Sequence, residues 1–352
     1  MSDSKYFTFP LDNLRTLNVF FGGRGIGKTF NFLKECVYKC KQTGRKFMYF
    51  RETEKIVQMV VAGNSIFNPI KEVDSSFPDI ELISEKGFFT ISEVNRISED
   101  KKKFEIIQEL GYVVAISTFH NARGLSFEDV DYIIFDEFIP EEGTVKRKNM
   151  DMLFLNMLET VNRNRELEGK PPVTVIMLTN ANSPYSEYLS VFGIDEIIDK
   201  MQEATDQELQ TTYDDGEIYV SFVSNAHFRN LKKNTFLYRR AKSQKFLAMA
   251  LDNQFSVNTA LIKKNPNMVK SKPILCVGSA TTYVLYELSD DTLIWRKGFN
   301  KGCIFYNIDN KQELMLFRFY FTDRLRRLYI SGSMFFDSIY TMREVLEMGS
   351  IL

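Results

Sequence analysis

Apolar and polar positions along the first 200 residues follow two alternating patterns. A short apolar run at Leu17–Phe21 leads into a glycine-rich turn, and from about Thr29 to Lys41 apolar residues recur every three or four positions. This order predicts a buried strand, a loop and a helix that packs one face on a sheet. A longer amphipathic stretch predicts a helix from about 149 to 168. Further apolar runs predict strands at Lys46–Phe50, Tyr112–Phe119, Asp131–Phe135 and Val173–Leu178. Because strands alternate with helices, we expect an α/β fold with a mostly parallel sheet and helices on both faces.

The pattern changes after residue 199. Acidic and then basic polar stretches fill residues 200–255, for which we expect a linker region. Beyond it, short apolar runs separated by Gly, Asp and Ser turns predict an antiparallel meander, closed by a helix at Met342–Met348. The four runs are Ile274–Val277, Tyr283–Leu288, Thr292–Arg296 and Cys303–Ile308. We therefore expect one domain at 1–199 and a smaller α+β domain at 256–352, as a chain of 352 residues usually divides.

Composition is that of an ordinary globular protein. Hydrophobic residues make up 44% and charged residues 26%, and the net charge of −1 does not indicate a nucleic-acid binder, so any DNA surface has to be local. The cysteines and histidines lack the paired spacing of a metal cluster, and we interpret all four cysteines, Cys36, Cys40, Cys276 and Cys303, as reduced core thiols. Cys36 and Cys40, four apart on the first helix, could in principle share a metal, but no second ligand pair lies nearby in the sequence. Met1–Pro10 lacks a signal-peptide pattern and no run approaches a membrane span, so we expect a protein of the cytoplasm, neither secreted nor membrane-bound.

The glycine-rich turn has the spacing of a phosphate-binding loop, GxxxxGK[ST], and it lies between a strand and a helix, as that motif requires. Glycines allow backbone N–H groups to turn toward phosphate oxygens, and the helix N-terminus adds partial positive charge. In such a loop Lys28 bridges the β- and γ-phosphates and the Thr29 hydroxyl ligates Mg²⁺. The alternative is a glycine-rich turn without a ligand. The sequence thus predicts ATP and Mg²⁺ as cofactors, bound by Gly22, Gly23, Arg24, Gly25, Ile26, Gly27, Lys28 and Thr29.

Two acids follow the apolar run that ends at Phe135. The carboxyl end of a parallel strand is where α/β proteins bind ligands. Asp136 is therefore the candidate metal residue beside Thr29, and Glu137 is the candidate base that orients and deprotonates the attacking water. Without the preceding phosphate-binding loop, a strand end with two charges would as readily be a solvated surface.

Polar residues after the next strand are candidates for sensing the γ-phosphate. Asn180 or Thr179 fits that role, although Asn180 can also simply begin a turn. Arg163 and Arg165 lie near the end of the preceding helix, where an arginine can reach a neighbouring subunit's nucleotide or can balance the helix C-terminus.

Several basic residues keep two interpretations each. Arg24 can touch phosphate or pair outward, and Arg51 can approach the nucleotide or pair with Glu52 or Glu54. Three basic groups are candidates for DNA contact, although runs of charge are more often solvated faces. These groups are Lys101–Lys103, Arg123 and Lys146–Lys148.

Five segments recur, in this order, in one protein family: Gly23–Lys28, Ile134–Ile139, Thr160–Glu166, Leu178–Ala181 and Leu251–Phe255. By these segments the chain resembles the DNA-packaging (encapsidation) ATPases of phi-twenty-nine-like small tailed phages. The likeness in residues runs from near residue 15 to about 255 and continues beyond it in length and pattern only. One departure concerns a lysine that the family places after the second strand, since Glu54 stands at that position with Lys55 next to it.

The resemblance implies an ASCE-type P-loop ATPase that moves double-stranded DNA into a prohead, working as a ring that is pentameric in the family. It implies docking on the portal, with a structural RNA as a further partner and transient attachment within the host cytoplasm. Arg163 matches the family's trans-acting arginine finger. A ring that assembles on a portal need not be stable alone, so a free monomer is compatible with this interpretation.

The C-terminal domain of the family resembles an RNase H-type nuclease that has lost its metal-binding acids. The first predicted strand of that domain, Ile274–Val277, contains no Asp, and a two-metal nuclease needs several converging carboxylates. We therefore expect no cleavage by residues 256–352. The remaining acids are scattered: Asp290, Asp291, Asp309, Asp323 and Asp337.

Two other classes of function remain to be weighed against a DNA translocase. In a nucleotide-gated docking protein with slow ATP hydrolysis, ATP would control binding to a partner, and Glu137 argues against it. A P-loop phosphotransferase would need an arginine-rich lid and an acceptor pocket, and the sequence indicates neither.

Overall fold

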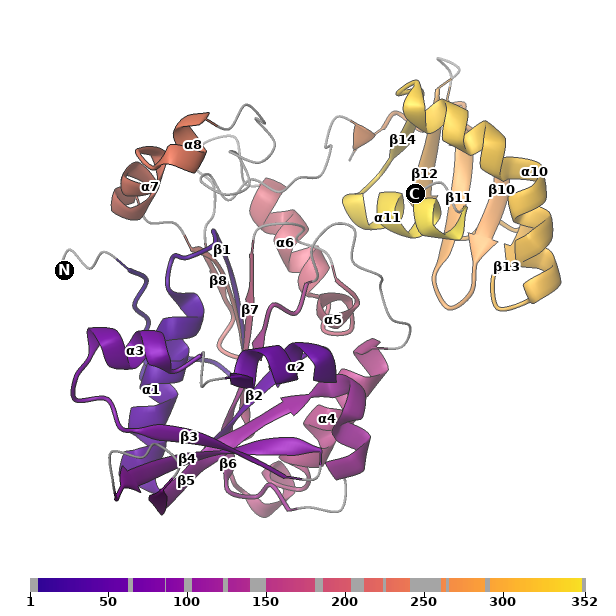
Figure 1. Ribbon diagram of the computed structural model, residues 1–352. Helices are drawn as coiled ribbons and strands as arrows, with labels where there is room; N and C mark the ends of the chain where they lie inside the picture. The colour runs from indigo at the N-terminus through magenta and orange to yellow at the C-terminus, as the bar shows by residue number, and fades with distance from the viewer. Residues whose placement is uncertain are drawn as a thin grey trace. The chain divides into compact units, whose positions relative to one another are not determined.

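A computed structural model gives the structure of the protein. It describes residues 6–62, 66–85, 87–97, 103–122, 126–139, 150–180, 186–203, 212–223, 226–240, 261–263, 266–288 and 292–349. The chain divides into two compact units, Met1–Ser256 and Val257–Leu352, and each has its own sheet (Figure 1).

The larger unit is a sheet covered by helices. Its strands are β1 Leu17–Gly22, β2 Lys46–Arg51, β3 Ile80–Ser84, β4 Phe88–Arg96, β5 Phe104–Ala115, β6 Val130–Asp136, β7 Thr174–Thr179, β8 Thr212–Asp214 and β9 Ile218–Val223. Its α-helices are α1 Lys28–Thr43, α2 Glu54–Val61, α3 Asn68–Val73, α4 Met150–Asn162, α5 Glu187–Ser190, α6 Ile194–Glu203, α7 Ala226–Lys233 and α8 Phe236–Arg240. Short 3₁₀ turns occur at Leu11–Asn13, Ile116–Ala122 and Glu166–Glu168.

The strand order of this sheet brings the candidate site together. Among the described residues the order is β3-β4-β5-β2-β6-β7-β1-β9-β8. The strands from β5 to β9 in this order pair in parallel, whereas β3, β4 and β8 are antiparallel additions at the two edges. β7 lies between β1 and β6, so the loops after β1, β7, β6 and β2 meet at one edge. The expected ASCE-type, mostly parallel α/β fold is confirmed.

Helices cover both faces because the central strands are apolar on both sides. In β1, Phe20 packs against Phe32 of α1 with ring centroids 4.9 Å apart, whereas its neighbour Phe21 belongs to the core on the other face, with Phe138. The first face is covered by α1, α2 and α3, and the second by α4, α5 and α6 (Figure 1). A parallel strand that is buried on both faces reads in sequence as an unbroken apolar run, and this is why β1, β2, β6 and β7 were predictable.

Two predicted elements end earlier than expected. The strand predicted at Tyr112–Phe119 stops at Ala115, because residues 116–122 turn into a 3₁₀ helix. The helix predicted over 149–168 is α4, which ends at Asn162. Arg163 has a left-handed backbone with φ 47°, and this conformation terminates a helix although the amphipathic pattern continues.

Part of the expected linker belongs to the sheet. β9 pairs in parallel with β1 along its whole length, and β8 adds to β9 as an antiparallel edge. The structure therefore differs from the expectation for residues 200–255, since Thr212–Val223 extends the larger unit. β8 has three residues with polar flanks and gives little periodicity, whereas the apolar run of β9, Ile218–Val223, was a signal that the sequence analysis missed.

The smaller unit contains β10 Lys272–Gly278, β11 Thr282–Glu287, β12 Leu293–Lys297, β13 Ile304–Asn307, α10 Lys311–Ile330, β14 Met334–Phe336 and α11 Ile339–Met348. The predicted antiparallel meander is right for β10, β11 and β12 and wrong for β13, which pairs in parallel with β10 at the edge of the sheet. β14, which was not predicted, adds in parallel to β12. Apolar runs locate strands, but they do not state the partner of each strand or its direction.

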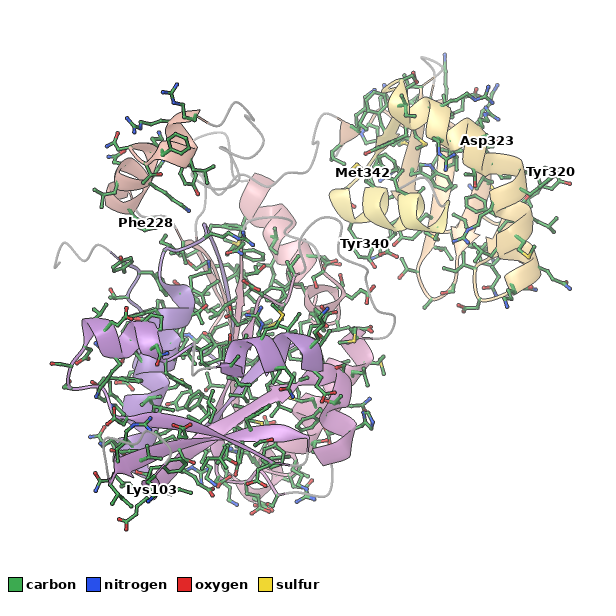
Figure 2. All side chains as sticks on the ribbon, in the orientation of Figure 1. Lys103, Phe228, Tyr320, Asp323, Tyr340 and Met342 are labelled. Carbon is green, nitrogen blue, oxygen red and sulfur yellow. The ribbon has the colours of Figure 1, made fainter. Side chains whose placement is uncertain are left out.

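The helix α10 was also missed by the sequence analysis. Phe317 and Leu325 of this helix are buried, whereas other large apolar residues are exposed, including Phe319 and Tyr320. Figure 2 labels Tyr320 on the helix. Apolar residues all round a helix leave no amphipathic stripe to detect. Among the described helices none has the length and apolar content needed to cross a membrane.

Gly111 of β5 supports a prediction about the sheet. A Cβ at this position would lie 2.1 Å from the carbonyl oxygen of Phe47 on β2, so a side chain requires the two strands to separate. We expect Gly111→Ala to destabilise the larger unit by about 3 kcal/mol. Far-ultraviolet circular dichroism during urea unfolding checks this. The single tryptophan, Trp295, is buried in the smaller unit and should report an unchanged transition there. An unshifted dichroism transition would contradict the prediction.

Candidate functional site

The phosphate-binding loop joins β1 to α1 with the backbone geometry its glycines allow. Gly25 and Gly27 have φ values of +76° and +101°, in the left-handed region that glycine adopts readily. Gly27 is the residue before the first turn of α1, so the free N–H groups of that turn face the loop. Lys28 is buried, and its ammonium donates to the carbonyls of Gly22 at 2.8 Å and Gly23 at 3.4 Å. Burial lowers the pKa of Lys28 to about 8.

A cavity of about 530 Å³ opens beside this loop. It brings together residues from the loop, from the ends of β6 and β7, and from α3. Its lining residues are Tyr6, Arg24, Gly25, Ile26, Gly27, Lys28, Thr29, Phe30, Pro69, Glu72, Val73, Asp136, Glu137, Thr179 and Asn180. Most of the predicted nucleotide residues therefore lie around one space, and Gly22 and Gly23 adjoin it through their bonds to Lys28.

Asp136 is the centre of a buried polar cluster at the end of β6. Its Oδ2 accepts a hydrogen bond from the Thr29 hydroxyl at 3.0 Å and another from the Tyr49 hydroxyl at 2.8 Å. The guanidinium of Arg51 lies 3.3 Å from the same oxygen. Burial raises the pKa of Asp136, while Arg51 and the Tyr49 hydroxyl act in the opposite direction. Tyr49 was missed by the sequence analysis, although a hydroxyl within the apolar strand Lys46–Arg51 was the available signal.

Glu137 follows Asp136 with a different environment. Its backbone has a left-handed φ of 51°, its N–H donates to Asp136 Oδ1 at 3.0 Å, and its side chain is half exposed. The other arm of Arg51 donates to the Glu137 carboxylate. Arg51 thus bridges the two acids, a role that neither sequence interpretation described, since those gave it the nucleotide, or Glu52 or Glu54, as its partner. Left-handed non-glycine residues are uncommon and gather at functional sites.

The oxygen donors fit a hard divalent cation. The Thr29 hydroxyl and the Asp136 carboxylate lie within hydrogen-bond distance of each other, so one ion can contact both. Hydroxyl and carboxylate oxygens are ligands that Mg²⁺ takes, usually with several waters and phosphate oxygens. This donor set is compatible with the predicted metal residues Thr29 and Asp136.

The end of β7 presents both candidate sensors to the cavity. Thr179 is buried and its hydroxyl donates to the carbonyl of Asn180 at 3.1 Å. Asn180 is the last described residue before 186 and is partly exposed at the cavity wall. Because β7 lies between β1 and β6, either side chain is placed between the phosphate loop and the acids.

Arg163 and Arg165 are separated by the structure into different environments. Arg163 is exposed, and its guanidinium lies 3.8 Å from Glu128, which precedes the amino end of β6. Asp136 ends the same strand six residues after Val130, roughly 20 Å away. Arg163 therefore does not reach the cavity of its own chain.

Arg165 is buried and holds the start of β6. It donates to the carbonyls of Val130 and Pro171 and to Asp131 at 2.8 Å. Burial raises the pKa of Asp131, but Arg45 and Arg165 outweigh burial and hold that pKa below its ordinary value. These contacts show that Arg165 stabilises the start of β6. The sequence did not distinguish this structural role from the role of Arg163.

Of the basic residues considered for DNA contact, the structure describes only Lys103, an exposed residue next to β5 (Figure 2). Lys101, Lys102, Arg123, Lys146, Arg147 and Lys148 lie outside the described residues. Within the described part of the chain, no group of three His, Cys, Asp or Glu residues is arranged to hold a metal ion. In the smaller unit Asp337 lies beside Arg296 and Asp323 beside Arg326, and Asp290 and Asp291 lie outside the described residues.

Comparison with known proteins gives one family and a small set of relatives. The family of the podovirus DNA encapsidation protein (Gp16) matches residues 3–284. The DNA packaging protein of Bacillus phage phi29 is 28% identical over 243 residues, which are 68% of this chain and 62% of that protein. The match therefore spans less than two thirds of the length of that relative.

Solved structures share the fold over most of the chain. The bacteriophage Phi-29 viral genome packaging motor assembly aligns with a TM-score of 0.63 and 19% identity, covering 99% of this chain and 99% of the other. The Phi-28 gp11 DNA packaging motor aligns with a TM-score of 0.59 and 18% identity, covering 93% and 92%. At these identities the alignments indicate a shared fold.

The contacts of Arg165 predict a loss of stability without a direct effect on the cavity. Arg165→Ala removes three hydrogen bonds and one of the two arginines that pair with Asp131. We therefore expect the free energy of unfolding of the larger unit to fall by about 3 kcal/mol. The measurement is urea unfolding by circular dichroism, with Arg163→Ala as the exposed control, expected to change by less than about 0.5 kcal/mol.

The pH dependence of this loss follows from the lowered pKa of Asp131. The Arg165–Asp131 pair stabilises the fold above the unfolded carboxyl pKa of about 3.9, and this contribution disappears as the pH falls through the folded pKa. The difference in the free energy of unfolding between wild type and Arg165→Ala should therefore become smaller as the pH falls. A difference that widens in acid would contradict this assignment.

Proposed function

The chain belongs to the podovirus DNA encapsidation protein family, and from that premise we propose that it is an ATP-driven motor that moves double-stranded viral DNA into a prohead. In this proposal the protein works as a ring at the portal, pentameric as in the family it resembles, and it occupies the host cytoplasm while transiently attached to the prohead. The proposal includes a structural RNA as a further partner. The smaller unit serves attachment, as a domain that resembles an RNase H-type nuclease without its acids.

One observation carries the proposal. The phosphate loop, the Thr29–Asp136 pair and Glu137 converge on a single cavity, and this is the set of groups that hydrolysis of a nucleoside triphosphate needs. Loop N–H groups and Lys28 hold the phosphates. When bound, Mg²⁺ neutralises charge on the phosphate oxygens next to Thr29 and Asp136.

Glu137 acts on the attacking water. Its half-exposed carboxylate at the cavity wall accepts a proton from that water and directs its oxygen toward the terminal phosphate. Arg51 sets how available this carboxylate is, because the same guanidinium holds both Glu137 and Asp136. Asn180 and Thr179, between the loop and the acids, are placed to sense the terminal phosphate.

Arg163 supplies the coupling between subunits. Its position at the amino end of β6 prevents it from reaching the cavity of its own chain, whereas its exposure leaves it accessible to a neighbouring subunit in a ring. An arginine donated in trans stabilises the charge that develops on the transferred phosphoryl group.

Steady-state ATP hydrolysis with and without double-stranded DNA tests the motor. We expect wild-type hydrolysis to rise with DNA and this stimulation to weaken between low and moderate salt, because phosphate contacts are salt-dependent. Glu137→Gln should be slower by about 10²- to 10³-fold, whereas the exposed Glu105→Gln on β5 should match wild type. A slow hydrolysis rate that does not change when DNA is added would instead favour a nucleotide-gated docking protein.

Mixing two inactive variants tests the trans role of Arg163. Arg163→Ala rings retain Glu137 but lack the finger, and Glu137→Gln rings retain the finger but lack the base. We expect each alone to be nearly inactive and an equimolar mixture to regain activity at about a quarter of the interfaces, if subunits assort at random. Undiminished hydrolysis by assembled Arg163→Ala rings, or no recovery in mixed rings, would exclude the trans role.

A further inference from the structure

The helix α7 contacts the phosphate loop, although it lies 200 residues later in the chain. The ring of Phe228 (labelled in Figure 2) lies 3.6 Å from the position that a Cβ on Gly25 would occupy. The same ring lies near that of Tyr6, with centroids 6.1 Å apart. Tyr6 itself lies against Gly27, 3.2 Å from its would-be Cβ. The two left-handed glycines of the loop are therefore each packed against an aromatic residue, Gly25 by Phe228 and Gly27 by Tyr6.

Lys232 provides the polar part of this contact. Its ammonium donates to the backbone carbonyl of Arg24 at 2.5 Å. The same nitrogen lies 5.5 Å from the ring centre of Phe228 and 5.0 Å from that of Tyr238 on α8. Both distances fall within the range of cation–π attraction. The two rings and one carbonyl hold this lysine in place, whereas the next residue, Lys233, is exposed.

The bonded carbonyl fixes the direction of a loop N–H group. The carbonyl of Arg24 and the N–H of Gly25 belong to one planar trans peptide, in which C=O and N–H point in opposite directions. A donor that holds the carbonyl toward α7 therefore turns the Gly25 N–H away from α7. Gly25 lines the cavity, where inward N–H groups bind phosphate oxygens.

A second peptide of the loop is held in the same manner. The carbonyl of Ile26 accepts a hydrogen bond from the backbone N–H of Phe7 at 2.9 Å, which directs the N–H of Gly27 to the opposite side. Alternate peptides of the loop are thus fixed by donors outside it. One donor is a backbone group, and the other is a lysine side chain from a distant helix.

We propose that Lys232 is a positioning residue of the nucleotide site, which holds the Arg24–Gly25 peptide in the orientation that binds phosphate. The inference rests on the proposed function in so far as the cavity takes a nucleoside triphosphate. It goes further in assigning part of the phosphate loop's geometry to residues 226–240, the last described segment of the larger unit. A shift of α7 would release the Arg24 carbonyl and weaken phosphate binding, so nucleotide affinity and the position of this helix are linked.

The test compares variants that separate the ammonium from its packing. Lys232→Met keeps the aliphatic stem between the rings and removes the donor, Lys232→Arg keeps a charged donor, and Lys233→Met is the matched control on the same helix. Titration of fluorescent ATP and ADP analogues in the presence of Mg²⁺ gives the dissociation constants. We expect Lys232→Met to bind both analogues about tenfold more weakly, Lys232→Arg to recover most of the affinity, and Lys233→Met to bind as wild type does.

Two further readouts separate positioning from general damage. In steady-state hydrolysis, Lys232→Met should raise KM for ATP by about tenfold with kcat within about twofold of wild type. Hydrogen exchange of the Gly22–Gly27 segment should be faster in Lys232→Met, with α1 exchanging as in wild type. Wild-type affinity in Lys232→Met, or equal losses in Lys232→Met and Lys233→Met, would overturn the proposal.

The outcomes also distinguish this inference from the proposed function. If the wild type binds the analogues but hydrolyses ATP without regard to DNA, the motor fails, and the affinity of Lys232→Met still decides the role of Lys232. If hydrolysis is stimulated by DNA and Lys232→Met behaves as wild type does, the motor stands and the inference alone fails.

Discussion

The buried carboxylate of Asp136 is the constraint on which the site depends. A charge with so little exposure needs partners, and three residues from two elements supply them: Thr29 from the start of α1, and Tyr49 and Arg51 from β2. These contacts tie the loop after β1 to the strand on the other side of β6. The same carboxylate thereby fixes the relative positions of the phosphate loop and the acids.

The strand order makes this arrangement possible. With β7 inserted between β1 and β6, the phosphate loop and the acids are two strands apart, and the cavity opens between them. The polar ends of β7 fill the intervening position. A sheet with β1 and β6 as direct neighbours would leave no place for Thr179 and Asn180 between the loop and the acids.

Three arginines that the sequence analysis treated as candidates near the nucleotide have different environments in the fold. Arg51 turns inward and bridges two acids, Arg165 binds the start of β6, and Arg163 is exposed at the far end of that strand. Only Asn164 separates Arg163 from Arg165, yet their side chains lie in different environments, and the backbone at Arg163 is left-handed. Local sequence alone does not contain this difference, because it depends on how α4 ends above the sheet.

The sequence by itself determined the elements that carry the chemistry. The phosphate loop and the two acids each follow an unbroken apolar run, and burial on both faces of a parallel sheet imposes such runs locally. Only the tertiary structure decided which distant groups complete the site. Tyr49, Arg51 and Lys232 reach it from β2 and α7 through pairing and packing that no spacing encodes. The parallel direction of β13 and the helix α10 escaped prediction, because partner choice and a helix with two apolar faces leave no periodic signal.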